Sequence, residues 1–135
     1  MLDLTPLAKA LAALDRGLVR WKAAPLDEEL RDACIQRFEF TFELAWKMRK
    51  RRLQLDLPDA QEVDRMTWRG LMRAGAEQGL VNDVDAWMLY REKRSITSHT
   101  YDAAKAAEVA AVIPAFAADA RSFYDRLSAR GGADA

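Results

Sequence analysis

The chain has 135 residues, half of them apolar, so we expect one domain with enough apolar material for a buried core. Its 21 basic and 21 acidic residues cancel, which argues against broad, non-specific nucleic-acid binding but leaves room for a local basic cleft. We predict a cytoplasmic protein without disulfides. The chain has a single cysteine, no signal-peptide pattern, and no apolar run near the roughly 20 residues that a bilayer span requires.

The first predicted helix runs from about Pro6 to Lys22. We expect Thr5 to cap it and Pro6 to occupy its first position. One face is apolar at helical spacing and should be buried, and its members are Leu7, Leu11, Leu14, Leu18 and Trp21. Pro25 separates this helix from a long second one, about Asp27 to Leu55.

The second predicted helix is apolar on more than one face. Such a helix must be buried on several sides, and in a small chain a partner subunit is the readiest cover. We therefore expect a homodimer through this helix, in the region of Phe38, Phe42 and Trp46. The basic run Lys47–Arg52 near its end is typical of a solvated face, although it could also line a local basic cleft.

A polar loop is expected after Leu57-Pro58-Asp59, followed by a short third helix from about Thr67 to Gln78. Gly79 and Leu80 have the pattern of a left-handed helix cap with its apolar contact. The third helix should therefore end at this glycine.

The fourth predicted helix starts at a cap formed by Asn82 or Asp83 and continues to about Thr97. A fifth runs from about Thr100 to Ala129, and its apolar register continues through Pro114, which we interpret as a kink. Residues 1–130 are thus predicted to form one all-α, up-and-down antiparallel bundle of four to five helices, and residues 131–135 a disordered tail.

His99 is the single histidine of the chain, and it lies in a stretch rich in groups that move protons or hold phosphate, Arg94–Asp102. The predicted fourth helix carries a stripe toward the core that changes from apolar to guanidinium as it approaches this stretch. Its members are Val84, Trp87, Arg91, Arg94 and Ser98. A buried arginine is costly unless an anion or a carboxylate accompanies it, so two arginines beside His99 predict an anion site.

Arg94 and His99 are five residues apart, about 140° from each other on a continuous α-helix. They converge on one ligand only if the helix ends or bends between them, and the run Ser95–Ser98 is a weak helix former. Asp102 would then lie favourably in the first turn of the next helix. The residues alone leave alternatives open, because His99 also fits a capping or hydrogen-bonding role and Tyr101 an ordinary core position. No metal site is predicted, because His99 has no companion at metal-ligand spacing.

Two segments resemble the nucleotidyltransferase substrate-binding protein family, part of the HEPN superfamily of small helical bundles. They are Phe38–Lys47 (FEFTFELAWK) and Thr97–Asp102 (TSHTYD). Arg94, His99 and Tyr101 match the R-x4-H-x-Y motif of that superfamily. The resemblance extends over nearly the whole chain in length and helix order.

This resemblance implies a dimeric bundle that works with a minimal nucleotidyltransferase. It further implies one of two functions. In the first, the protein is a metal-independent ribonuclease toxin, and the nucleotidyltransferase is an antitoxin that attaches AMP to Tyr101. In the second, it is a non-catalytic subunit that binds the substrate or nucleotide of a two-component nucleotidyltransferase.

The chemistry of RNA cleavage suits the motif. His99 would transfer the proton of the 2′-hydroxyl, and Arg94 would hold the phosphate through several hydrogen bonds. No cofactor is implied, and a dimer would supply the second histidine that one chain lacks. Many family members have Asn or Asp directly after the motif arginine, where Ser95 would orient its neighbours less firmly. The remaining phosphate or RNA contacts are expected from Arg91, Lys93, Ser98 and Tyr101.

Overall fold

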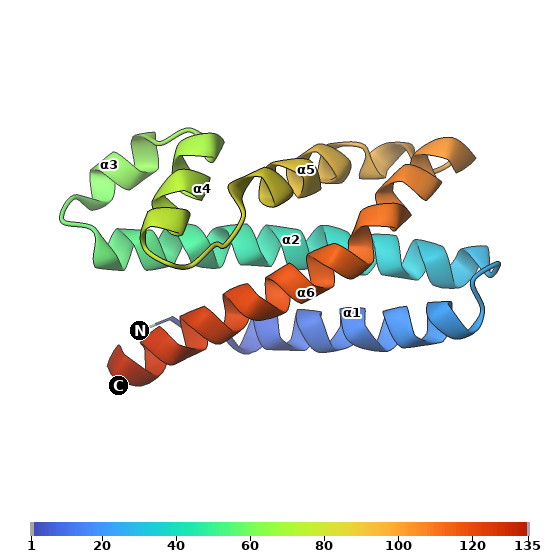
Figure 1. The fold of residues 1–135 in the computed structure, drawn as a ribbon, viewed down its shortest axis with the longest axis horizontal. Coiled ribbons are helices and arrows are strands. Elements are labelled where there is room, and N and C mark those ends of the chain that lie inside the picture. Colours follow the sequence, from blue (N-terminus) through green and yellow to red (C-terminus); the bar gives the residue numbers. More distant parts are fainter. Residues whose placement is uncertain (1, 135) are drawn as a thin grey trace.

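The computed structural model describes residues 2–134, and of residues 131–134 only the backbone. This part of the chain forms six α-helices and one short 3₁₀ helix and contains no strand (Figure 1). The prediction of an all-α fold is confirmed. The elements are α1 (Thr5–Ala23), α2 (Glu28–Asp56), α3 (Ala60–Arg65), α4 (Trp68–Glu77), α5 (Val84–Ser95), η1 (Thr97–His99) and α6 (Ala103–Asp134).

Helix α2 is the centre of the bundle and contacts α1, α3, α4, α5 and α6 (Figure 1). Neighbouring α1 and α5 run antiparallel to α2, while α6 runs back across α1 and α2 toward the chain's N-terminal end. The four long helices thus follow the predicted up-and-down order, and α3 and α4 form a short excursion between α2 and α5.

Helix α1 starts one residue earlier than predicted. Thr5 is its first residue and not its cap, because the Asp3 carboxylate accepts the Thr5 N–H at 3.0 Å. The predicted apolar face is buried at Leu7, Leu11 and Leu14, and only partly buried toward the end of the helix.

The many apolar faces of α2 are covered within one chain. Asp27 caps the helix by accepting the N–H groups of Glu29 and Leu30. Phe38 and Phe42 are buried, and Phe38 packs edge-on against Phe116 of α6 at 4.8 Å between ring centroids. The expected homodimer through Phe38, Phe42 and Trp46 remains a prediction. Of these three residues, only the partly buried Trp46 offers surface to a second subunit.

The loop expected between α2 and α4 contains a helix, α3, which the sequence analysis missed. Asp59 caps it through the Gln61 N–H, and its one buried residue is Val63. The predicted end of α4 is confirmed: Gly79 has φ +76° and the Leu80 N–H donates to the Gly75 carbonyl at 2.8 Å.

Helix α6 confirms the predicted register through Pro114. It starts at Ala103 and not Thr100, because the Asp102 carboxylate accepts the Ala104 N–H at 2.9 Å. The sequence predicts a disordered tail over residues 131–135, whereas the backbone of residues 131–134 continues α6. The buried residues of the register are Val109, Ile113, Phe116, Ala120, Phe123 and Leu127. Among the described helices, none is both long and apolar enough to cross a membrane.

Candidate functional site

The helix break predicted between Arg94 and His99 is present. Helix α5 ends at Ser95, and a single 3₁₀ turn, η1, carries His99. The Thr97 hydroxyl donates to the Arg94 carbonyl at 2.9 Å, and the His99 N–H donates to the Ile96 carbonyl at 3.0 Å. Side chain and backbone thus fix the turn that separates the two motif residues.

Arg94 is half-buried and is held by α2. Its guanidinium lies 3.4 Å from a Glu39 carboxylate oxygen and 3.2 Å from one of Glu43, and it donates to the Thr97 hydroxyl at 3.2 Å. The two carboxylates offset the cost of removing the guanidinium from water. Both glutamates are more exposed than Arg94, so an incoming phosphate would have to share the guanidinium with them.

Arg91 does not face the core as predicted. It is exposed, and its guanidinium carbon lies 5.1 Å from the centroid of the Trp68 ring. The core position of this part of α5 is taken by Tyr90, whose hydroxyl donates to Asp119. Burial, followed by that hydrogen bond, raises the pKa of Tyr90.

Lys93 points to a different helix. Its ammonium donates to Glu108 of α6 at 2.7 Å, and this hydrogen bond raises the pKa of Lys93. The structure therefore separates Lys93 from Arg91 and Arg94, because on a helix Lys93 is about 200° from Arg91 and about 100° from Arg94.

A pocket of about 300 Å³ brings Arg91 and Arg94 together. Its wall comes from α2, α4 and α5 and consists of Phe42, Glu43, Trp46, Trp68, Arg91, Arg94 and Ser95. A second hollow of about 580 Å³ shares Arg91 and Ser95 with it, so the two adjoin along α5. Arg69 of α4 adds another cation to the second hollow.

His99, Ser98 and Tyr101 are exposed beyond the helix break. The rings of His99 and Tyr101 lie edge to face, 6.1 Å between centroids, and Tyr101 is 86% exposed. The alternative of Tyr101 as a core residue is therefore wrong. Within one chain, the described residues that line the pocket at Arg94 do not include these three.

The basic run Lys47–Arg52 is a solvated face only in part. Lys47 and Arg51 are exposed, whereas Arg49 and Arg52 are buried. Arg52 pairs with Asp56 one helical turn later, and Arg49 lies in the aromatic core. The run does not form one cleft, because its members point to different sides of α2.

Three residues near Arg94 were missed from the sequence. Glu39 and Glu43 are four apart, the spacing that places two side chains on one helix face, but no sequence pattern predicts their contact with Arg94 of α5. Trp68 follows directly after the cap of α4, and its contact with Arg91 depends on tertiary packing. In the described chain, no cluster of three His, Cys, Asp or Glu residues could hold a metal ion.

Comparisons with known proteins agree on one family. A protein-family model described as nucleotidyltransferase substrate binding protein like matches residues 2–129. A Haemophilus influenzae protein named probable ribonuclease HepT is 34% identical over 120 residues, 89% of this chain and 82% of that protein.

Two solved structures have the same fold. A Haemophilus influenzae structure, described as the fold of a substrate binding domain of a nucleotidyltransferase, matches with a TM-score of 0.89 and 31% identity over 93% of this chain and 99% of that one. A protein of Thermus thermophilus matches with a TM-score of 0.70 and 30% identity over 90% of this chain and 98% of that one.

Proposed function

This chain belongs to the nucleotidyltransferase substrate-binding protein family, and on that premise we propose that it is a metal-independent ribonuclease toxin paired with a minimal nucleotidyltransferase. The observation that carries the proposal is the helix break, which holds Arg94 half-buried on one side and presents His99 to solvent on the other. The name of the Haemophilus influenzae relative, probable ribonuclease HepT, supports the same reaction.

The proposed cleavage uses the 2′-hydroxyl of the RNA as nucleophile. His99 accepts the hydroxyl proton while the 2′-oxygen attacks the adjacent phosphorus, and Arg94 stabilises the negative charge on the phosphorane. The bond from phosphorus to the 5′-oxygen then breaks, and that oxygen takes a proton from a second acid. A second copy of His99 would supply this acid, so the proposal includes a homodimer.

Replacement of His99 by alanine tests the proposed reaction. We expect purified wild-type protein to cleave single-stranded RNA in the presence of EDTA, and H99A to be slower by about 100-fold or more, because general acid–base catalysis contributes that much. R94A should also cleave RNA much more slowly than wild type. R20A, which removes an exposed arginine of α1, should cleave RNA at the wild-type rate. Wild-type protein that neither cleaves RNA nor slows growth would rule out the toxin.

The second candidate is a non-catalytic subunit that binds the substrate or nucleotide of a nucleotidyltransferase. The pocket at Arg94 favours it, because His99 and Tyr101 are not among the described residues of its wall. The solved Haemophilus influenzae structure is described in the same terms. Under this function wild-type protein and H99A would both be inactive on RNA and would bind nucleotide equally well.

Tyr101 is the proposed site of neutralisation. Its hydroxyl oxygen would attack the α-phosphorus of ATP and form a phosphodiester with AMP, while pyrophosphate leaves and the tyrosine proton passes to a base on the partner. Of the three tyrosines, Tyr90 is buried and Tyr124 partly buried, so Tyr101 is the accessible one.

The modification can be read by mass spectrometry. After incubation with the partner and ATP, we expect the peptide containing Tyr101 to gain the mass of AMP and RNA cleavage to stop. The variant Y101F should gain no mass and should stay active in the presence of the partner. AMP found on Y101F, or on Tyr124, would contradict this assignment.

A further inference from the structure

The pocket at Arg94 has walls that the proposed reaction does not use. Phosphate chemistry requires Arg94 and gains from Arg91, but Phe42, Trp46 and Trp68 also line this space. Arginines can bind a phosphate without aromatic neighbours, so phosphate binding does not explain why these three aromatic side chains line the pocket.

We propose that this pocket is a subsite for one unpaired nucleobase, stacked against Trp68, whose attached phosphate is held by Arg91 and Arg94. The proposal rests on the proposed function for the identity of the phosphate, which is that of an RNA strand or of a free nucleotide. Both sources share the same chemistry, a base with a phosphate attached.

Trp68, supported by Phe42, provides a flat aromatic surface in the pocket. Trp68 and Phe42 are nearly parallel, with 14° between their planes and 5.9 Å between centroids, and Phe42 is buried. Because Phe42 is fixed in the core, it backs the partly exposed Trp68 and limits its movement. Such stacking stabilises any of the bases, because every base has a flat aromatic face.

The cations are placed for a phosphate next to that face. The guanidinium of Arg91 lies over the Trp68 ring, 5.1 Å from its centroid, and Phe42 stacks on the same ring, so a base reaches Trp68 when Arg91 swings aside toward the phosphate. Among the described residues no carboxylate pairs with Arg91 and holds it in place. Arg94 borders the same space and already lies beside Glu39 and Glu43, so Arg91 is the arginine more available to a new anion.

The pocket has room for one base. A volume of about 300 Å³ is at the small end of the range for ligand sites and accommodates a base with part of its sugar. Bases inside a duplex are stacked and paired, so they cannot reach Trp68. The subsite therefore selects single-stranded RNA or a free nucleotide over double-stranded RNA.

Binding of labelled single-stranded RNA to the H99A protein tests the subsite without cleavage. We expect W68A in this background to weaken binding by about tenfold or more, the loss that one stacked base represents. The matched control is W21A, which removes a partly buried tryptophan from the groove between α1 and α6. R91A, an exposed position whose loss leaves the core intact, should weaken binding too.

Two further ligands distinguish an RNA strand from a free nucleotide as the bound molecule, and failure of the subsite from failure of the proposed ribonuclease. RNA with abasic positions should bind H99A weakly, and AMP should compete with intact RNA only if the pocket also accepts a free nucleotide. Unchanged affinity of both W68A and R91A, or tight binding of abasic RNA, would overturn the subsite. Wild-type protein that binds through Trp68 but does not cleave would overturn the ribonuclease and leave the subsite standing.

Discussion

Arg49 is a cation in the middle of the aromatic core. It is 1% exposed, and its guanidinium carbon lies 4.4 Å from the ring centroid of Trp87 and 4.8 Å from that of Phe123. One of its nitrogens donates to the Met72 sulfur, and two others have no hydrogen-bond partner among the described residues. Burial lowers the pKa of Arg49 to about 9, so at neutral pH the charge persists and is stabilised by ring faces.

Methionine at position 49 should make the protein more stable. The R49M side chain fills similar space without a desolvated charge, and by analogy with the replacement of buried ion pairs by apolar side chains we expect a gain of up to about 1–4 kcal/mol in the free energy of unfolding. Urea denaturation measures the change, and R51M, at an exposed neighbour, should alter it by less than about 0.5 kcal/mol. A less stable R49M would mean that the contacts with the rings outweigh the cost of burial.

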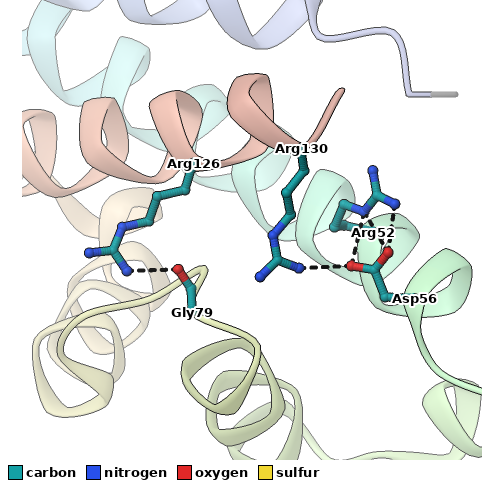
Figure 2. A network of polar contacts seen from close by, with 5 residues as sticks. All are labelled: Arg52, Asp56, Gly79, Arg126 and Arg130. Atoms are coloured by element: carbon teal, nitrogen blue, oxygen red, sulfur yellow. Dashed lines mark hydrogen bonds and ion pairs between the residues drawn. The ribbon is translucent and has the colours of Figure 1, made fainter. Parts of the chain in front are cut away.

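The C-terminal ends of α2 and α6 are joined by charged groups. Figure 2 shows Arg52 and Arg130 converging on Asp56, and Arg126 donating to the Gly79 carbonyl between α4 and α5. Burial raises the pKa of Asp56, but the hydrogen bonds and charges of Arg52 and then Arg130 outweigh it, so the pKa is lowered. The last turns of α6 therefore hold two other parts of the bundle in place.

The substitution D56N tests the contribution of these ion pairs to stability, because that contribution should depend on pH. We expect D56N to lose about 1–2 kcal/mol of unfolding free energy at pH 7, because a charged acceptor is lost. The folded pKa lies below the ordinary 3.8, so the stabilisation is present above that pH and is lost as the pH falls through the folded value.

Thermal or urea unfolding of both proteins between pH 7 and pH 2 measures this effect. The difference between wild type and D56N should stay constant down to about pH 5 and shrink below it. D125N, at an exposed position of α6, serves as the control. A difference that does not change with pH would show that the charge on Asp56 contributes nothing.

The candidate functional groups of this bundle, which has no net charge, lie along α5 and the turn after it. The pocket at Arg94, the neighbouring hollow and the helix break all involve α5 or the turn after it. One chain carries a single copy of His99, so the proposed reaction needs two chains. Light scattering should therefore give about twice the 15.3 kDa of one chain, and a monomer that cleaves RNA would contradict the need for a second histidine.

Local patterns made much of this molecule predictable. The Gly79 cap, the break after Arg94 and the register of α6 each depend on residues within a few positions of one another. The missed elements lack such a pattern: α3 has one buried residue, Val63, and a single apolar side chain shows no periodicity. Burial of Arg49 and the contact of Trp68 with Arg91 depend on residues distant in sequence, which a helical pattern does not encode.

The chemistry of the RNA ends tests the central claim most directly. A single-stranded RNA with one 2′-deoxy nucleotide, and its all-ribose counterpart, would be incubated with wild-type protein and H99A in EDTA, and the products analysed by mass spectrometry. We predict cleavage of the all-ribose RNA to 2′,3′-cyclic phosphate ends, none at the 2′-deoxy position and almost none with H99A. Cleavage at the 2′-deoxy position, equal cleavage by H99A, or no cleavage by wild-type protein would contradict the account.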